Sequence, residues 1–299
     1  MILIALLGQT CSGKSEMAVE LAEKLGDTWI INCDSRQIYK ELDLGTGKVE
    51  GQWENETYYY KNIKHFLIDY VAPKINFGLV DYIQDFIELT KKIDLPKYLI
   101  LTGGTGLYAR AILEKYELGI IKKEFIQNNE ILKRGLQELN LENLQLKYDQ
   151  LNINNPKILN PSDYANPRRL VNWILRKNAL EENWLEKIQY PSFSKTFNFA
   201  INANQENLKI KIKDRIIKRI EQGLLQEVES LLYLGKDRLF QLGLEYKYTY
   251  KYIMGELGGL EWKERLFLEN YHYAKRQLTW LKKQSPDWIH STDQILESL

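Results

Sequence analysis

Short apolar runs alternate with longer amphipathic segments along most of this chain. Runs typical of buried strands occur at 2–7, 29–33 and 98–102, and weaker ones at 63–68 and 197–201. Apolar residues recur at helical spacing in 14–25, 81–93 and 106–114. Strands that alternate with helices in this way favour βα units around a parallel sheet. The pattern therefore predicts an α/β fold in which helices flank a parallel sheet.

The pattern changes between about 115 and 165, where helical spacing continues in segments rich in Asn, Gln and charged residues. This composition predicts a small all-helical insertion. Pro167 is expected to open a helix that returns the chain to the core, and further helices are expected at about 207–222 and 262–283. We therefore predict a catalytic core made of 1–114 and 166–299, with 115–165 as the inserted domain.

Size and composition restrict the class of protein. A chain of 299 residues can bury a large core and form one main domain with an added lobe. The two cysteines, Cys11 and Cys33, are not expected to pair, which favours a reducing, cytoplasmic setting. The first apolar run is short and has no basic leader, so it is predicted to be a core strand. No stretch approaches the roughly 20 apolar residues of a membrane span.

Charge is distributed unevenly. The net charge is only +1, yet basic residues outnumber acidic ones in 161–299 and are outnumbered in 1–160. Basic clusters occur at 168–169, 209–219, 275–276 and 282–283, with Tyr and Trp between them. Such clusters are typical of a surface that binds a phosphodiester backbone. The alternative is that they are ordinary solvated helix faces.

A complete phosphate loop follows the first predicted strand and precedes a predicted helix. Its spacing is Gly-x4-Gly-Lys-Ser, and its residues are Gly8, Gln9, Thr10, Cys11, Ser12, Gly13, Lys14 and Ser15. Backbone N–H groups and the helix N-terminus would surround phosphate oxygens. Lys14 would add a positive charge, and the Ser15 hydroxyl is the expected ligand of Mg²⁺.

Two further strand ends supply candidate chemistry. Asp34 directly follows the run at 29–33, where a kinase-like fold places its acceptor. The strand at 98–102, in contrast, ends in Thr102-Gly103-Gly104-Thr105-Gly106 and carries no carboxylate. Because a phosphate-loop NTPase normally has an Asp there to hold Mg²⁺ through water, hydrolysis is not the obvious reaction. The combination indicates a transferase with a phosphorylated donor and a nucleophilic acceptor.

Several motifs in order give the chain a specific resemblance. They are Gly8 to Ser15, Asp34-Ser35-Arg36-Gln37-Ile38-Tyr39, Leu44-Gly45-Thr46-Gly47-Lys48, His65-Phe66-Leu67-Ile68-Asp69, Gly103 to Tyr108, and Lys275-Arg276-Gln277-Leu278-Thr279-Trp280-Leu281. Over nearly its whole length the chain resembles the tRNA dimethylallyltransferase family, also called tRNA isopentenyltransferases. No Cys/His cluster follows residue 283, so the resemblance is to the bacterial type.

The resemblance implies a P-loop NTPase-like core and a single reaction. A prenyl group passes from dimethylallyl diphosphate to the exocyclic amine of the adenosine 3′ of a tRNA anticodon. The catalytic residues that it implies are Asp34, as the general base, together with Thr105 and Arg215. A family pattern similar to Arg-Ile-x-x-Arg falls on 211–215, which implies that Lys211 and Arg215 bind the diphosphate together with the phosphate loop and Mg²⁺.

The resemblance also implies how tRNA binds. The channel near the extruded base would be lined by Asp34, Ser35, Arg36, Gln37 and Thr105. Contacts with the anticodon stem-loop are implied for Arg168, Arg169, Leu170, Val171, Asn172, Lys275, Arg276, Gln277, Thr279, Trp280 and Lys282. The helical insertion would clamp the RNA. We expect a monomer that needs no obligate protein partner.

The sequence departs from the family pattern at several positions, which are Gly47, Phe66, Asn166, Asn172, Lys211 and the segment 243–247. Three other functions remain open. A small-molecule kinase would use the same loop with ATP, and a free-nucleotide isopentenyltransferase would share the loop and Asp34. An RNA-binding protein without activity would have no need of Asp34, Lys14 and Ser15 together.

Overall fold

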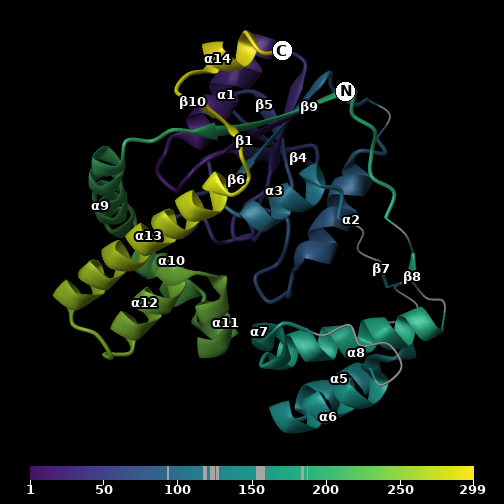
Figure 1. Cartoon of the computed structure of the whole chain (residues 1–299). Coiled ribbons are helices and arrows are strands. Elements are labelled where there is room, and N and C mark those ends of the chain that lie inside the picture. The colour runs from purple at the N-terminus through teal and green to yellow at the C-terminus, as the bar shows by residue number, and fades with distance from the viewer. Residues whose placement is uncertain are drawn as a thin grey trace. The chain divides into compact units, whose positions relative to one another are not determined.

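The computed structural model describes residues 1–92, 94–116, 120–121, 125, 128–152, 159–182, 185–186 and 188–299. In this structure the chain forms two compact units (Figure 1). Met1–Lys115 and Tyr190–Leu299 form the first unit, here called the sheet unit. Tyr116–Gln189 forms the second, here called the helical unit. Each unit has its own buried core, and each is described separately below.

An eight-stranded sheet in the order β10-β9-β1-β6-β2-β5-β4-β3 organises the sheet unit. Six strands run parallel, namely β1 (Ile2–Leu7), β2 (Thr28–Asn32), β5 (Ile63–Phe66), β6 (Tyr98–Gly103), β9 (Lys195–Ile201) and β10 (Asp287–Ile289). The antiparallel strands β4 (Thr57–Tyr60) and β3 (Gln52–Glu54) extend one edge. Leu3 of β1 pairs with Leu99 on one side and Thr196 on the other. The expected parallel sheet is thus confirmed.

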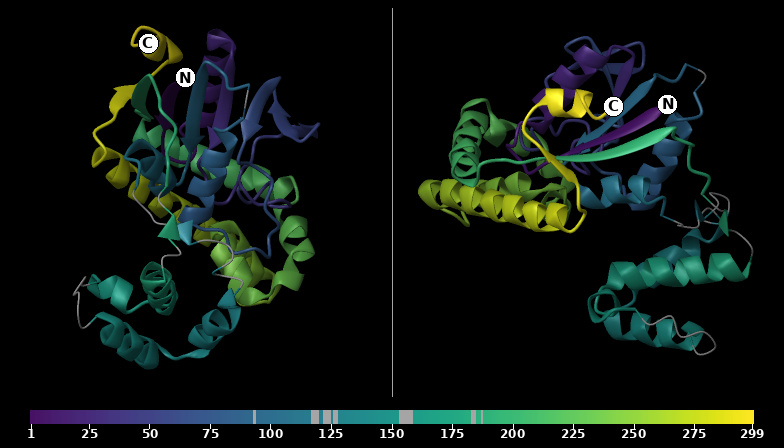
Figure 2. Two further views of the ribbon diagram at one scale, coloured as in Figure 1. Left: turned by 90° about the vertical axis from the view of Figure 1, so that its right-hand side faces the viewer. Right: turned by 45° about the horizontal axis from the view of Figure 1, so that its top comes forward.

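Helices cover both faces of the sheet because its central strands are apolar on both sides. Helix α1 (Lys14–Leu25) packs with α14 (Thr292–Leu296) on one face, where Ile4, Leu6 and Val19 share a core (Figure 2). Helices α2 (Leu79–Leu89) and α3 (Gly106–Leu113) pack against each other, with the Tyr82 and Tyr108 rings stacked 4.3 Å apart. This layering places the N-termini of α1 and α3 at the carboxyl ends of the strands.

A second core joins five C-terminal helices to the segment after β2. The helices are α9 (Gln205–Glu221), α10 (Leu224–Ser230), α11 (Lys236–Leu242), α12 (Leu244–Ile253) and α13 (Gly259–Lys282), with the short 3-10 helix η1 (Leu232–Leu234) between α10 and α11. Ile38 and Leu42 are fully buried against Ile212, Leu242 and Leu266. Helix α13 also runs beside α9 and contacts α3 (Figure 1). This core therefore anchors the loops that surround the strand ends.

The helical unit contains α5 (Glu130–Glu138), α6 (Leu141–Asn152), α7 (Pro161–Tyr164) and α8 (Pro167–Glu181), and the short strands β7 (Ile120–Ile121) and β8 (Leu185–Glu186) pair within it. Leu170 and Ile174 of α8 are buried against Leu136 and Leu144. The predicted boundary at 165 is therefore too early, because α8 belongs to this unit and not to the catalytic core. Pro167 does open a helix as expected, and Asn166 caps it by accepting a hydrogen bond from the Arg169 N–H.

Among the described residues, none of the helices combines the length and the apolar character that crossing a bilayer requires.

Candidate active site

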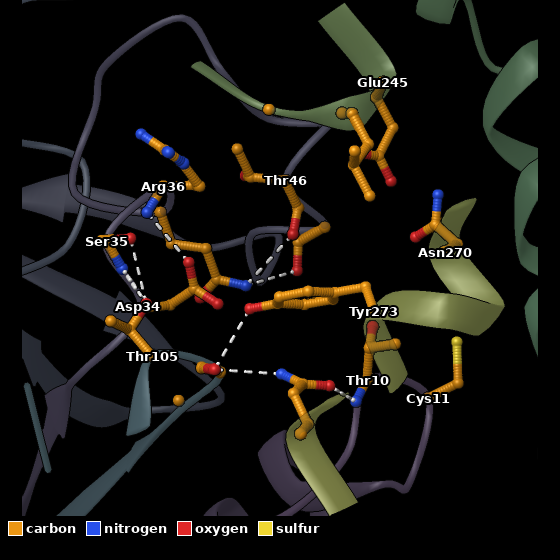
Figure 3. Close-up of a pocket in the computed structure, with 18 of the residues that line it drawn as sticks. Thr10, Cys11, Asp34, Ser35, Arg36, Thr46, Thr105, Glu245, Asn270 and Tyr273 are labelled. Carbon is orange, nitrogen blue, oxygen red and sulfur yellow. Dashed lines mark hydrogen bonds between the residues drawn. The ribbon is translucent and has the colours of Figure 1, made fainter. Parts of the chain in front are cut away.

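The carboxyl ends of β1, β2 and β6 open into a cavity of about 860 Å³ that lies wholly within the sheet unit (Figure 3). Parallel α/β sheets bind ligands at this edge because strand-to-helix loops and helix N-termini meet there. The phosphate loop, the segment after Asp34, the loop 45–47 and the Gly103–Gly106 turn line the cavity from the sheet side. Helices α9, α11, α12 and α13 supply most of the remaining wall.

The phosphate loop takes the conformation that its glycines allow. Gly13 caps α1 with a left-handed φ of 90°, and Cys11 also has a positive φ, of 61°. Lys14 and Ser15 follow in the first turn of α1 and line the cavity. Burial lowers the pKa of the Lys14 ammonium, while the Asp34 carboxylate acts in the opposite direction. The cavity therefore holds a lysine whose charge is poorly solvated and which an anionic ligand would stabilise.

Two residues of the loop turn their side chains elsewhere. Gln9 is buried, and its Nε2 donates a hydrogen bond to the Ala274 carbonyl of α13 at 2.9 Å. The Ser12 hydroxyl lies beneath Gly8, where a Cβ would stand 2.5 Å from Ser12 Oγ. Neither Gln9 nor Ser12 lines the cavity, although both belong to the loop predicted to bind diphosphate, and the Gln9 hydrogen bond ties the loop to α13.

Asp34 faces the cavity just beyond β2. Its backbone N–H donates to Asn32 Oδ1 at 3.0 Å, and its Oδ1 accepts from the Arg36 N–H at 2.9 Å. Thr105 Oγ1 accepts from the Ser35 N–H at 2.9 Å and donates to Ser35 Oγ at 3.0 Å (Figure 3). Thr105 thus fixes the segment that carries Asp34. The structure brings together the predicted residues Asp34, Ser35, Arg36, Gln37 and Thr105, all of which line the cavity.

Arg215 of α9 reaches the phosphate loop from the opposite wall. Its Nη1 donates to Thr10 Oγ1 at 2.7 Å and its Nη2 donates to Asn270 Oδ1 at 3.1 Å. Its Nε is buried without a hydrogen-bond partner. Lys211, which was predicted to act with Arg215, is exposed and does not line the cavity. Lys218 and Arg219 line it instead, because the cavity faces the C-terminal half of α9.

Arg219 is a buried cation that the sequence indicated only as part of the basic run at 209–219. Its Nη1 donates to Glu245 Oε1 at 2.9 Å and to the Gly45 carbonyl at 3.2 Å. Burial, followed by the nearby Arg215 charge, lowers its pKa to about 10. The ion pair with Glu245 offsets part of the cost of burying this guanidinium.

Helix α13 closes the cavity with one face. Gln277 Oε1 accepts from the Thr10 N–H at 2.7 Å and Gln277 Nε2 donates to the Gly104 carbonyl at 3.0 Å. Tyr273, which was not predicted, donates its hydroxyl to the same carbonyl at 3.1 Å. The Trp280 ring lies against Gly106, where a Cβ would stand 2.5 Å from it. Gln277, predicted to contact tRNA, is therefore committed to the protein backbone and connects two loops of the site.

The other α13 residues that were predicted to contact tRNA lie either at the cavity or on the exposed face of the helix. Arg276 lines the cavity, whereas Lys275, Thr279 and Lys282 are exposed. Lys275 Nζ lies 4.5 Å from the centre of the Tyr271 ring, and Thr279 Oγ1 donates to the Lys275 carbonyl. These exposed groups are available to a partner outside the cavity.

The predicted stretch 168–172 lies in the helical unit. Arg168 and Asn172 are exposed on α8, and Arg169 forms an ion pair with Asp163. Leu170 and Val171 are buried in the core of that unit. Their side chains cannot contact tRNA, because helical periodicity turns them inward between the exposed positions.

Among the described residues, no group of three or more His, Cys, Asp or Glu side chains is placed to hold a metal ion. The Ser15 hydroxyl lines the cavity beside Lys14. Mg²⁺ usually keeps several waters and binds through few protein groups plus substrate phosphates. The donor set around Ser15 fits an ion that arrives with a diphosphate, and it does not resemble a preformed all-protein cage.

Known proteins match this chain over most of its length. A family model described as IPP transferase matches residues 37–284, and one described as isopentenyl transferase matches residues 1–68. This chain belongs to the IPP transferase family. Among curated members, it is 32% identical to tRNA dimethylallyltransferase 1 of Azobacteroides pseudotrichonymphae, over 94% of this chain and 88% of that protein. It is 33% identical to tRNA dimethylallyltransferase 2 of Shewanella sediminis, over 94% and 89%.

Solved structures of IPP transferases give the same picture of the fold. The tRNA isopentenylpyrophosphate transferase from Bacillus halodurans aligns with a TM-score of 0.64 and 25% identity, over 96% of this chain and 89% of that one. A eukaryotic dimethylallyltransferase acting on tRNA aligns with a TM-score of 0.69 at 21% identity, over 98% of this chain and 74% of that one, which shows the shared fold. The family and the α/β phosphate-loop core predicted from the motifs are thus confirmed.

Proposed function

We propose that this protein transfers the dimethylallyl group of dimethylallyl diphosphate to N6 of the adenosine directly 3′ of a tRNA anticodon, and releases diphosphate. The observation that carries the proposal is one cavity that holds a phosphate loop on one side and the Asp34 carboxylate on the other. Relatives that match over 94% of the chain are named as tRNA dimethylallyltransferases. In this proposal the donor binds at the phosphate-loop end of the cavity and the acceptor binds at the Asp34 end.

The diphosphate end is formed by the phosphate loop and Arg215. In the transfer step, the bond between the prenyl C1 and the diphosphate oxygen breaks, and that oxygen keeps the electron pair. The growing negative charge is stabilised by the loop N–H groups, Lys14 and the Arg215 guanidinium. Mg²⁺, when bound at Ser15, would neutralise further charge on the diphosphate.

The acceptor end is formed by Asp34 and its neighbours. The new bond joins C1 to N6, and one N6 proton passes to the Asp34 carboxylate. An aromatic amine is a weak nucleophile, so removal of this proton as the bond forms assists the reaction. The Asn32 side chain holds the Asp34 backbone and the Arg36 N–H holds the Asp34 carboxylate, which together keep the carboxylate in place for this role.

The RNA must deliver an unstacked base to this cavity, because a stacked adenine cannot present its amine. We assign contacts with the stem-loop to exposed polar residues, namely Arg168, Arg169, Asn172, Lys275, Arg276, Thr279 and Lys282. The helical unit, Tyr116–Gln189, is proposed to clamp the RNA. Its exposed basic side chains on α8 support that role.

The test supplies Mg²⁺, labelled dimethylallyl diphosphate and either an anticodon stem-loop with adenosine 3′ of the anticodon or free AMP. We expect label only in the stem-loop, and none when that adenosine is replaced by guanosine. Label in AMP alone would instead identify a free-nucleotide isopentenyltransferase. Label in neither acceptor would contradict the proposal, and phosphoryl transfer from ATP would then be examined.

A further inference from the structure

We propose that Glu227 is a positioning residue for the acceptor end of the site, and that it acts through the loop 43–47 to fix the orientation of the Gln37 amide. The inference rests on the proposed function, because it concerns recognition of the adenine amine. Glu227 lies on α10, in the second core of the sheet unit, and is not among the residues that line the cavity.

The Glu227 carboxylate binds three consecutive backbone N–H groups. Its Oε2 accepts from Asp43 N at 3.1 Å and Leu44 N at 2.7 Å, and its Oε1 accepts from Gly45 N at 2.9 Å. The Tyr246 hydroxyl donates to Oε1 at 2.7 Å. Successive N–H groups that converge in this way form an anion-binding nest. Here the anion is a side chain of the protein, so the loop is held in one conformation.

Side chains that pack on the loop require its glycines. The Tyr246 ring lies against Gly45, where a Cβ would stand 2.5 Å from the ring carbon Cζ. Arg219 lies against Gly47, where a Cβ would overlap Nη2, and it also donates to the Gly45 carbonyl. Gly47 has a φ of +65°, which side chains rarely adopt. Helices α9, α10 and α12 therefore each contribute a group that fixes the loop.

The far end of the loop determines how Gln37 is oriented. Gln37 Nε2 donates to the Gly47 carbonyl at 3.0 Å and to the Thr46 carbonyl at 3.4 Å. Because both carbonyls are acceptors, the amide nitrogen must face the loop and the amide oxygen must point away from it. Gln37 lines the cavity three positions after Asp34. Its oxygen can then accept the second N6 hydrogen while Asp34 receives the first.

This arrangement predicts a preference for a base with an amino group. If the Glu227 nest is lost, the loop relaxes, the two carbonyls no longer fix Nε2, and the Gln37 amide can turn its donor towards the base. The binding of adenine should then weaken relative to that of a base without the amine. The diphosphate end should be unaffected, because Lys14 and Arg215 do not contact this loop in the described hydrogen bonds.

The experiment compares Glu227→Gln with the wild type and with the control Glu229→Gln, an exposed residue two positions along the same helix. Two anticodon stem-loops are bound competitively, one with adenosine and one with purine riboside at the target position. Diphosphate affinity is measured separately by calorimetry. We expect Glu227→Gln to reduce the adenosine-to-purine affinity ratio by up to about tenfold, the effect of one hydrogen bond. Diphosphate affinity and the Glu229→Gln ratio should stay within about twofold of wild type.

An unchanged ratio in a folded Glu227→Gln variant would overturn the inference, and so would an equal loss of diphosphate affinity, which would indicate general damage. If that variant does not fold, Tyr246→Phe removes one donor to Glu227 and leaves the three N–H groups, so it should lower the same ratio by a smaller factor. Absence of prenyl transfer by the wild type would instead contradict the proposed function, which separates the two failures.

Discussion

Asp34 illustrates how much of the site depends on a single side chain and its immediate neighbours. Its position after β2 follows from the sequence, but its orientation depends on Asn32, which accepts its N–H, and on the Arg36 N–H, from which its carboxylate accepts. Asn32 Nδ2 also donates to the Leu67 carbonyl at 2.8 Å, so the backbone that carries Asp34 is tied to the loop after β5. The carboxylate therefore needs little rearrangement to act as a base.

Asp34→Asn should lower kcat by about 10²–10⁴, the usual contribution of a general base, and leave stem-loop affinity within a few-fold of wild type. The amide keeps the shape and can still accept from the Arg36 N–H, but it cannot take a proton. Single-turnover transfer and a separate binding titration check both parts. A variant with normal kcat and weakened RNA binding would show that Asp34 recognises the base and does not deprotonate it.

Arg215 and Lys211 provide a matched pair on one helix. Both were predicted to bind diphosphate, but only Arg215 reaches the phosphate loop, and Lys211 is exposed. Arg215→Met should lower kcat/KM for dimethylallyl diphosphate by roughly 10- to 100-fold, as expected for a hydrogen-bonded charge. Lys211→Met should leave it unchanged. The measurement is steady-state kinetics in which the concentration of dimethylallyl diphosphate is varied. An equal fall of kcat/KM in the two variants would support the sequence-based assignment of both residues.

Among the elements, the segment after β2 and the loop that follows β5 are joined by one buried lysine. Lys48 Nζ contacts Asp43 and Asp69, each at 2.6 Å, and donates to the Tyr39 carbonyl at 2.8 Å. Two motifs that carried the family resemblance, Leu44–Lys48 and His65–Asp69, are thus bonded to each other. Lys48 and Asp69 therefore have a structural role, because their ion pair supports the loops of the acceptor end.

His65 of β5 predicts a pH dependence of stability. Burial lowers its pKa below the usual 6.5, so the unfolded chain binds more protons than the folded protein as pH falls below 6.5. Stability contributed by neutral His65 is present above that pH and is lost as pH falls towards the folded pKa. His65→Phe, which keeps an aromatic ring beside Tyr58 and Tyr60, should therefore show a smaller fall in Tm between about pH 7.5 and 5. Parallel Tm curves for the two proteins would contradict this assignment.

For the whole molecule, RNA binding depends on exposed charge outside the cavity. Lys282 and Lys283 at the end of α13 are exposed, so their replacement should not disturb the core. Lys282→Gln with Lys283→Gln should weaken stem-loop binding and reduce the slope of log affinity against log salt by about one for each phosphate that the protein no longer neutralises. A second variant, Lys263→Gln with Glu264→Gln at the start of the same helix, replaces two exposed charges without changing the net charge and should leave the slope unchanged. For the first variant, a slope equal to that of wild type would show that Lys282 and Lys283 do not contact the phosphates of the RNA.

Local signals were sufficient for the sheet core and for much of the site. Six residues of the phosphate loop, Asp34 and Thr105 line one cavity, because each segment follows a strand end and such ends converge in a parallel sheet; their roles there stay predictions. Arg219, Glu245, Tyr273 and Asn270 were missed, because nothing in their local sequence distinguishes them from other helical positions. The predicted boundary at 165 differs from the division seen in the structure, because the helix that Pro167 opens was expected to return the chain to the core, whereas it packs inside the helical unit.

The chemistry at each strand end could be inferred from sequence alone, since a phosphate loop and a carboxylate after neighbouring strands need only local geometry to be recognised. The family could be inferred in the same way, through motifs that occur in order. The side chains that complete the site from across the cavity became evident only in the folded chain. Those contacts join residues far apart in the chain, such as Tyr273 with Gly104 and Glu227 with Leu44, and depend on how helices pack. The periodicity of a sequence shows which face of a helix is buried, but it does not show which other segment packs against that face.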